Sequence, residues 1–298
     1  MGGIGAVKKK GVRIAILSTR DRRYHPNGRL LESAHEMGYE AVLLHPRNVL
    51  PGIGLAPGKE KIFHVVVPRI GSTIEEHELA VLFHLEQEGL PCLNGFRALV
   101  VARDKFLSLR RLEAHNIPVP RSLMIQEPAQ IPRAVKSLGG FPVVAKGLRG
   151  RQGTTVEKIQ DQDFAKYFAA HPPYPIQAVL LQEFLPTASL GDARIVVVGG
   201  RVAAYMRRMP RKGEFRSNVH LRGRGMLWDP PGEWLDLAVR AARVLELQVA
   251  GVDMLEGPRG PLVMEVNTTP GFRELERVSG VDVASQIIKA AAELAQGG

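Results

Sequence analysis

The chain has 298 residues, a length that favours two domains and allows a sizeable hydrophobic core. Apolar residues make up 45% and charged residues 23%, which excludes disordered and collagen-like classes of protein. Lysine and arginine outnumber aspartate and glutamate by 40 to 30, so the formal net charge is +10. This excess predicts an acidic partner, and composition leaves nucleic acid, an anionic membrane, phosphates and a carboxylate-rich substrate all open.

Cysteine usage and the N-terminus indicate a cytoplasmic protein. Cys92 is the single cysteine, so an internal disulfide, a zinc knuckle and an iron–sulfur cluster are excluded. The first ten residues lack the apolar core of a signal peptide. The longest apolar run, residues 195–206, is interrupted at Gly199 and Gly200 and falls far short of the ~20 residues of a membrane helix. We therefore expect no membrane association.

Apolar, β-branched runs alternate with amphipathic segments in the first hundred residues. The expected strands are residues 12–18, 41–44 and 62–67, and the expected helices are residues 28–37 and 74–88. This alternation predicts a small parallel α/β domain over residues 11–100, which follows a basic N-terminal extension at residues 1–10.

The pattern changes after Asn94 and Gly95. Asp104 is a predicted N-cap for a helix with Phe106, Leu109 and Leu112 on one side. Short strands separated by glycine-containing turns follow, and these indicate antiparallel pairing. The expected strands are 141–146, 154–159, 179–184, 192–198 and 202–209, and the expected helices are 234–245 and 283–294. The second part is therefore predicted to be α+β with antiparallel or mixed sheets.

A hairpin near the C-terminus carries the sharpest local pattern. If residues 258–260 form a three-residue turn, with Gly260 at positive φ, Asp253 pairs directly with Glu265. Asn267 follows two residues later and shares the face of Glu265. Two carboxylates and an amide are suitable oxygen ligands for a Mg²⁺ ion that bridges nucleotide phosphates. The alternative is a solvated strand face with ordinary acidic residues.

Lys146 closes an apolar strand just before the basic, glycine-rich residues 147–154. A lysine at this point can pair with phosphate oxygens while the N–H groups of the loop cover them. The motif is not a Walker A loop, because GxxxxGK[ST] is absent, and no GxGxxG follows a strand. The alternative is a surface lysine whose alkyl stem packs on the strand.

A basic cluster follows the strand at 202–209. Its members are Arg207, Arg208, Arg211, Lys212, Arg216, Ser217, Asn218, Arg222 and Arg224. The cluster predicts a clamp for phosphate or carboxylate, with a mobile basic loop or an RNA-binding patch as alternatives. Only Tyr205, Phe215 and Trp228 interleave with it, which argues against a stacking platform for single-stranded RNA. The absence of HExxH and GxSxG argues against zinc and serine hydrolases.

A set of short motifs occurs along the chain in a fixed order: Pro-Arg-Ile-Gly at 68–71, Asn94, Arg-Asp-Lys at 103–105, Val-Val-Ala-Lys at 143–146, Gln-Gly at 152–153, Leu-Gln-Glu-Phe at 181–184, Gly-Asp-Ala-Arg at 191–194, Gly-Glu-Phe-Arg-Ser-Asn at 213–218, Gly-Val-Asp at 251–253, Met-Glu-Val-Asn at 264–267 and Pro-Gly at 270–271. In this order the motifs resemble the ATP-grasp superfamily, and more narrowly the RimK-type ligases that add glutamate to the C-terminus of a small-subunit ribosomal protein. The resemblance extends from Val12 to the final helix.

The resemblance implies a fold and a set of site residues. The fold is an α/β pre-ATP-grasp domain at 11–100, then two ATP-grasp subdomains at 101–180 and 181–298 that hold ATP between them. The implied nucleotide-binding residues are Lys105, Lys146, Gln152, Gly153, Glu183, Phe184, Asp192, Arg194, Arg216, Ser217 and Asn218. Lys105 and Lys146 would contact phosphates, residues 182–184 adenine, and Asp192 the ribose. Arg216 and Asn218 would be catalytic. The implied ligands of two Mg²⁺ or Mn²⁺ ions are Asp253, Glu265 and Asn267.

The implied reaction is ATP-dependent amide formation through an acyl phosphate, and it yields ADP and phosphate. The implied partners are L-glutamate and an acidic protein or peptide acceptor such as a small-subunit ribosomal protein. The enzyme would be a homo-oligomer. It would contact nucleic acid only through proximity to the ribosome. Free poly-glutamate synthesis, a cofactor glutamyl ligase, an amino-group carrier-protein ligase and a non-catalytic RNA-binding protein remain alternatives. The sequence departs from the family pattern at Arg149 and Arg151, where relatives carry an acidic and a small polar residue. Much of the +10 charge lies in residues 147–151 and 207–224, which we interpret as provision for ATP and a glutamate-rich substrate.

Overall fold

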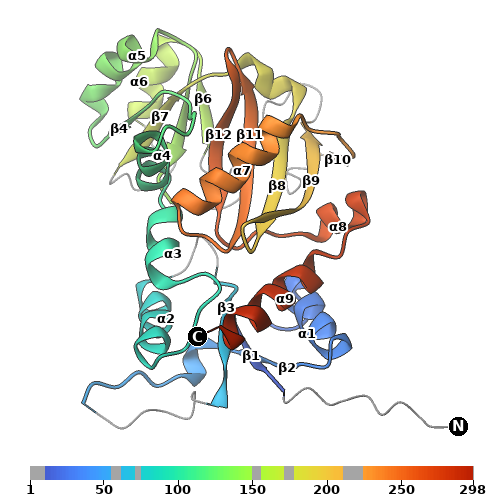
Figure 1. The fold of residues 1–298 in the computed structure, drawn as a ribbon. Coiled ribbons are helices and arrows are strands. Elements are labelled where there is room, and N and C mark those ends of the chain that lie inside the picture. Colours follow the sequence, from blue (N-terminus) through green and yellow to red (C-terminus); the bar gives the residue numbers. More distant parts are fainter. Residues whose placement is uncertain are drawn as a thin grey trace, which may run out of the picture.

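The computed structural model describes residues 11–54, 62–70, 75–149, 156–170, 178–210 and 224–297. Three sheets organise this part of the chain (Figure 1). The first has the order β2-β1-β3 and is parallel, with strands β1 (Arg13–Leu17), β2 (Glu40–Leu44) and β3 (Val65–Pro68). Helix α1 (His25–Glu36) connects β1 to β2, and helix α2 (Glu76–Gln87) follows β3. The predicted parallel α/β arrangement is confirmed.

The last helix of the chain packs against this first sheet. Helix α9 (Val283–Gln296) lies beside α1 and β3 in Figure 1. Its Ile287 and Ile288 belong to one hydrophobic cluster with Ile14 and Ile16 of β1. The covering of the N-terminal sheet therefore depends on residues more than 200 positions away along the chain.

The second sheet is antiparallel and has the order β4-β7-β5-β6. Its strands are β4 (Ser122–Ile125), β5 (Val143–Gly147), β6 (Val156–Ile159) and β7 (Val179–Glu183). Helices α5 (Ile131–Leu138) and α6 (Gln162–Ala170) bury their apolar sides against it. The sheet thus presents Lys146 and Glu183 at the ends of β5 and β7.

The third sheet is antiparallel throughout and has the order β10-β9-β8-β11-β12. Its strands are β8 (Asp192–Val198), β9 (Arg201–Met209), β10 (Arg224–Met226), β11 (Val249–Gly257) and β12 (Gly260–Asn267). Helix α7 (Gly232–Val244) covers one face, with Trp234 and Leu237 packed on Ile195 and Val252. The prediction of antiparallel or mixed sheets in the second part is confirmed.

The opposite face of this sheet changes character along its strands. Val196, Met206 and Val249 pack in the cluster that also contains β1, β3, α8 (Arg273–Ser279) and α9. On each strand the residue two positions away lies on the same face. Arg194, Arg208 and Gly251 therefore continue this face beyond Val196, Met206 and Val249, and Asp253 lies two residues beyond Gly251. The face therefore runs from an apolar domain contact into a charged site.

Helix α4 (Lys105–Ala114) begins as predicted. The Asp104 carboxylate accepts hydrogen bonds from the backbone N–H groups of Phe106 and Leu107, at 3.0 and 3.1 Å. This N-cap sets Lys105 at the first position of the helix, beside the end of β5, where its backbone N–H donates to Leu148 O at 2.9 Å. Helices α3 (Phe96–Ala102), α5, α6 and α8 were not predicted, because segments of seven to nine residues carry too few turns to show a clear helical period.

The β11–β12 hairpin confirms the predicted pairing but corrects its turn. Gly257 lies opposite Gly260, so the turn has two residues, and Gly260 has φ +108°. This shorter turn alone would move the register by one residue. A β-bulge leaves Met264 without a partner and restores Asp253 opposite Glu265.

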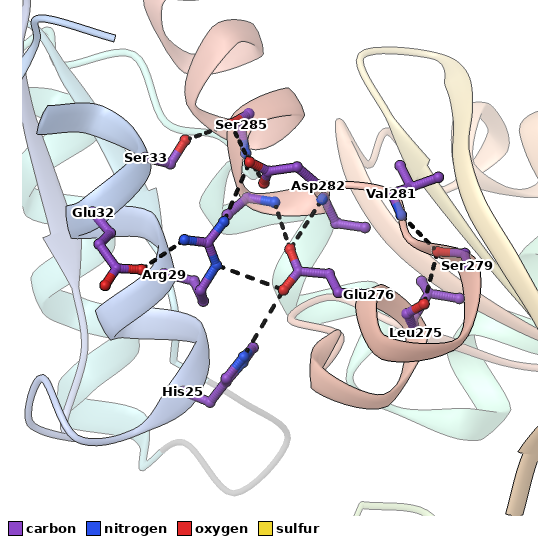
Figure 2. A network of polar contacts seen from close by, with 12 residues as sticks. His25, Arg29, Glu32, Ser33, Leu275, Glu276, Ser279, Val281, Asp282 and Ser285 are labelled. Carbon is purple, nitrogen blue, oxygen red and sulfur yellow. Dashed lines mark hydrogen bonds and ion pairs between the residues drawn. The ribbon is translucent and has the colours of Figure 1, made fainter. Parts of the chain in front are cut away.

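A polar network attaches α1 to the helices at the end of the chain (Figure 2). The Arg29 guanidinium lies 2.6 Å from Glu32, 3.2 Å from Asp282 and 3.7 Å from Glu276. Glu276 also accepts the backbone N–H groups of Val283 and Ala284, at 3.0 and 3.2 Å. The network holds the N-terminus of α9 against α1. Because α9 packs on both the first and the third sheet, the network also stabilises the contact between these two sheets.

Candidate functional site

Asp253 lies at the centre of a cluster of charged side chains on the third sheet. Arg194 binds both of its carboxylate oxygens, with Nη2 2.7 Å from Oδ2. Arg208 reaches the same Oδ2 at 3.0 Å and also holds Asp192 through two hydrogen bonds. Burial alone would raise the pKa of Asp253, but the two guanidinium groups reverse this and hold it below its usual value. Asp253 is therefore an ionised, buried carboxylate.

The two other predicted metal ligands lie beside Asp253 on β12. Asn267 donates its side-chain N–H to Asp253 Oδ2 at 3.3 Å and to the Gly251 carbonyl at 3.4 Å. Glu265 is half-buried, and its Oε1 lies 3.4 Å from Lys105 Nζ. The structure thus brings together the three residues predicted from the hairpin, and adds Lys105 from α4.

Lys146 faces this group from the second sheet. Its Nζ donates to Gln182 Oε1 at 2.5 Å, and Gln182 in turn donates to Ser122 Oγ at 2.9 Å. Burial lowers the pKa of Lys146 to about 8, with Lys105 acting in the same direction and Glu265 and Asp253 opposing it. Lys146 therefore lies within electrostatic range of Lys105, Glu265 and Asp253, and the contact between Lys105 and Glu265 joins α4 to this group.

The predicted adenine strand ends β7 and has partners of its own. Glu183 accepts from Arg121 Nε and from the Arg121 backbone N–H, both at 2.8 Å. Lys158 Nζ lies 3.9 Å above the ring of Phe184. The other predicted site residues, Gln152, Gly153, Arg216, Ser217 and Asn218, lie outside the described residues, as does Arg151.

Asn94 positions the β11–β12 hairpin, a role that the sequence motif did not reveal. It donates to the Val249 and Thr268 carbonyls at 2.7 and 3.0 Å, and accepts from the Gln248 and Val249 N–H groups at 2.7 and 2.8 Å. Thr268 directly follows Asn267. The buried Asn94 amide therefore joins the start of β11 to the end of β12. The sequence could not reveal this role, because the partners lie more than 150 positions away along the chain.

The side-chain oxygens of Asp253, Glu265 and Asn267 suit a Mg²⁺ ion that also binds nucleotide phosphates better than a metal ion bound only by protein side chains. Among the described residues, no group of three His, Cys, Asp or Glu side chains could enclose a metal ion. Mg²⁺ commonly takes one or two carboxylates and completes its octahedron with phosphate oxygens and water. Asp253, Glu265 and Asn267 meet that requirement, although Arg194 and Arg208 now bind the oxygens of Asp253.

Comparisons with known proteins assign the chain to a family. A model described as the RimK-like ATP-grasp domain matches residues 102–291, and one described as the RimK PreATP-grasp domain matches residues 12–99. The chain belongs to the RimK-like ATP-grasp family. It is therefore an ATP-dependent, ADP-forming ligase that makes C–N bonds. The predicted resemblance and fold class are confirmed.

Curated relatives match nearly their whole length. A "Probable alpha-L-glutamate ligase 1" of Shewanella amazonensis is 37% identical over 284 residues, which cover 93% of this chain and 94% of the relative. A "Probable alpha-L-glutamate ligase" of Methanococcoides burtonii is 36% identical over 285 residues, with the same coverage.

Solved structures share the fold. A RimK domain protein ATP-grasp from Sphaerobacter thermophilus has a TM-score of 0.74 and 27% identity, over 94% of this chain and 99% of the other. The ligase PsnB, complexed with a phosphomimetic variant of its minimal precursor, Mg and ADP, has a TM-score of 0.72 at 20% identity, over 96% and 99% of the two chains. Among the described residues, no helix is long and apolar enough to cross a membrane.

Proposed function

We propose that this RimK-like ligase adds L-glutamate to the C-terminus of an acidic protein or peptide, with a small-subunit ribosomal protein as the acceptor. The observation that carries the proposal is the site between the second and third sheets, where Lys105 and Lys146 face Asp253 and Glu265. Two relatives that match 93% of the chain carry the names "Probable alpha-L-glutamate ligase 1" and "Probable alpha-L-glutamate ligase", which supports glutamate as the amino acid. The net charge of +10 suits an acidic acceptor.

The proposed nucleotide site uses both sheets. Lys105 and Lys146 bind the phosphates, and Glu183 and Phe184 lie beside adenine. Asp192 takes the ribose. Gln152 and Gly153 cover the phosphates, and Arg216, Ser217 and Asn218 contact the transferred group. The partly exposed position of Lys146 at the end of β5, with one amide partner, supports its part in this assignment.

Asp253, Glu265 and Asn267 are the proposed ligands of two Mg²⁺ or Mn²⁺ ions. A divalent ion supplies charge neutralisation for the phosphates and needs lone pairs of Asp253 that guanidinium N–H groups now occupy. Arg194 is the partner expected to release the carboxylate and turn to phosphate, because Arg208 keeps a second carboxylate, Asp192. This movement gives Arg194 its proposed nucleotide-binding role.

The proposed reaction has two steps. A carboxylate of the acceptor attacks the γ-phosphate of ATP, which gives an acyl phosphate and ADP. The amino group of glutamate then displaces phosphate and forms the amide. Lys105, Lys146, Arg216 and Asn218 stabilise the charge that develops on the phosphoryl oxygens, and no covalent protein nucleophile is needed.

The proposed organisation of the chain follows from the same family. A basic extension at 1–10 precedes the pre-ATP-grasp domain at 11–100, and the two ATP-grasp subdomains occupy 101–180 and 181–298. We also propose that the enzyme is a cytoplasmic homo-oligomer. Size-exclusion chromatography with light scattering tests the oligomeric state directly.

Phosphate release tests the ligase activity. Purified protein with ATP, Mg²⁺ and L-glutamate should release phosphate when a glutamate-rich peptide with a free C-terminus is added, and mass spectrometry should find glutamate on the peptide. Lys146→Ala and Asn267→Ala should each reduce the rate by about 100-fold or more, since each removes a group that stabilises charge in the phosphoryl transfer. Lys136→Ala, at an exposed position on α5, is the control and should leave the rate unchanged. Equal rates in all variants would contradict the site assignment.

The identity of the product separates the alternative acceptors. Elongation of free glutamate, or transfer to a cofactor or a carrier protein, would retain the same nucleotide dependence with a different product mass. A non-catalytic RNA-binding protein would instead bind RNA with a steep salt dependence and no requirement for ATP.

A further inference from the structure

Arginines of this protein repeatedly bind carboxylates through one edge, formed by Nε and Nη2. Arg194 presents this edge to Asp253, and Arg208 presents it to Asp192. The same edge joins Arg13 to Glu40, Arg23 to Asp21 and Arg277 to Glu274. The two N–H groups of this edge match the two oxygens of a carboxylate.

Arg69 presents the same edge without a carboxylate. It follows directly after β3 and is 6% exposed. Its Nη2 donates to the Pro270 carbonyl at 2.9 Å, while its buried Nε has no hydrogen-bond partner among the described residues. Burial lowers the pKa of Arg69, and Tyr24 opposes this through electrostatic attraction and a side-chain hydrogen bond; in the described part of the chain it is the only ionisable neighbour that acts on this pKa. Half of a carboxylate-binding edge is thus unused.

An arginine buried in this way is costly for the protein. Removing a cation from water costs several kcal/mol, and buried charges are normally paired with an opposite charge. The Phe272 ring, whose centroid lies 5.7 Å from the guanidinium carbon, contributes a weak cation–π contact. The Pro270 carbonyl, the Tyr24 side chain and the Phe272 ring bring no carboxylate to this charge, so the position suits an anion that arrives with a substrate.

A second unused polar atom lies against the same aromatic ring. His25 packs edge-to-face on Phe272, with the ring centroids 5.8 Å apart. Its Nε2 points toward Glu276, 3.9 Å away (Figure 2), and its buried Nδ1 has no partner among the described residues. Arg69 and His25 therefore place unpaired polar atoms around one side chain.

These residues lie where the parallel sheet and the β11–β12 hairpin meet. All three strands are parallel, but β2 pairs with one side of β1 and β3 with the other, so the strand order switches at β1. Ligands of α/β sheets bind outside the carboxyl ends of the strands at such a switch point. Arg69 and His25 both follow this edge. Pro270, which Arg69 binds, packs so closely on β11 that a Cβ at Gly251 would come 2.7 Å from its ring and 3.7 Å from Arg194 Cδ. The unused edge of Arg69 is thus next to the proposed reaction site.

We propose that Arg69, assisted by His25, binds a carboxylate of the acidic substrate at the junction of the pre-ATP-grasp domain and the β11–β12 hairpin. The inference rests on the proposed glutamate ligase function and names the group that would hold its substrate. The carboxylate belongs to L-glutamate or to the acidic acceptor peptide, and both sources present the same chemistry to Arg69.

Direct binding tests the proposal without turnover. Isothermal titration in the presence of ADP and Mg²⁺ measures the affinity of L-glutamate and, separately, of a glutamate-rich peptide. Arg69→Met should weaken one of the two by about 10- to 100-fold, as expected for a charge-assisted pair of hydrogen bonds. Arg69→Lys keeps the charge but not the paired edge and should be intermediate, and His25→Phe should cause a smaller loss. Arg133→Met, at an exposed position on α5, is the control.

The pattern of loss identifies the source of the carboxylate. A loss for L-glutamate alone assigns Arg69 to the amino acid, and a loss for the peptide alone assigns it to the acceptor; either supports the proposal. Unchanged affinity for both ligands in Arg69→Met, Arg69→Lys and His25→Phe overturns it. If Arg69→Met does not fold, as judged by circular dichroism, the other two variants decide.

Failure of the ligase function gives a different result. If phosphate release never depends on glutamate or peptide, the proposed function falls whatever the binding data show. If turnover is normal and the KM values of the Arg69 variants equal those of the wild type, the ligase function stands and the role of Arg69 falls.

Discussion

Two buried arginines show opposite ways of keeping a cation inside this protein. Arg208 is 3% exposed and binds Asp192 and Asp253, and these carboxylates raise its pKa against the effect of burial. Arg69 is 6% exposed and has a carbonyl, the Tyr24 side chain and an aromatic ring as partners, while its Nε is unpaired among the described residues. The first arrangement is complete in the chain itself. The second is complete only if an anion is supplied from outside, and this difference marks Arg69 as a binding residue.

Removing Arg208 should have the largest effect on stability. Arg208→Met leaves Asp192 without its bidentate partner and Asp253 with Arg194 alone, and should lower the free energy of unfolding by about 3 to 5 kcal/mol. Because the arginines lower the pKa of Asp253, their stabilisation is present above about pH 4 and is lost as the pH falls. Urea denaturation of both proteins at pH 7 and at about pH 2, where the stabilisation is being lost, measures this, and a constant difference between the two pH values would contradict the assigned cause.

Asn94 should come next, because it is neutral but fully hydrogen-bonded. Asn94→Ala leaves the Val249 and Thr268 carbonyls and two backbone N–H groups without their partner, and should cost about 2 to 4 kcal/mol. Since Asn94 holds the strand end beside Asn267, we also expect weaker Mn²⁺ binding in the presence of ADP. Electron paramagnetic resonance measures that binding, and a stability loss with unchanged Mn²⁺ affinity would limit Asn94 to the fold.

Arg69 should matter far less for stability than its burial suggests. Replacing a buried, incompletely paired cation by an apolar side chain of similar length is often neutral, so Arg69→Met should change the free energy of unfolding by no more than about 1 kcal/mol. Urea denaturation beside Arg208→Met makes the comparison direct. A loss as large as that of Arg208→Met would mean that Arg69 is structural.

The exposed pair Arg121–Glu183 should give the smallest effect. Arg121 is mostly exposed, and its own backbone N–H still donates to Glu183 when the side chain is removed. Arg121→Ala should therefore cost less than about 1 kcal/mol in the same denaturation experiment. A larger loss would show that the lost bond to the Leu138 carbonyl is important.

Local patterns in the sequence were sufficient for most of the longer elements and for part of the site, but not for the short helices or for β4 and β10. Apolar periodicity predicted the βαβ unit and the antiparallel pairs, and Asp104 predicted the start of α4, because strand faces and N-caps depend on neighbours in the chain. The hairpin pairing of Asp253 with Glu265 was correct, although the assumed turn was one residue too long. A bulge at Met264 compensates, and bulges depend on packing across the sheet, which a local pattern does not report.

The sequence by itself determined which charged and polar groups are available for binding: the carboxylates and the amide of one hairpin, Lys105 and Lys146, and many arginines. Only the tertiary structure decided which of them are satisfied, since partners such as Arg208 and Asp253, or Arg69 and Pro270, are separated by 45 and 201 positions. Burial and long-range pairing set the free energy of a charge inside a protein, and neither can be read from adjacent residues. For that reason the motif at Arg69 could be recognised in the sequence, whereas its unused edge could be found only in the fold.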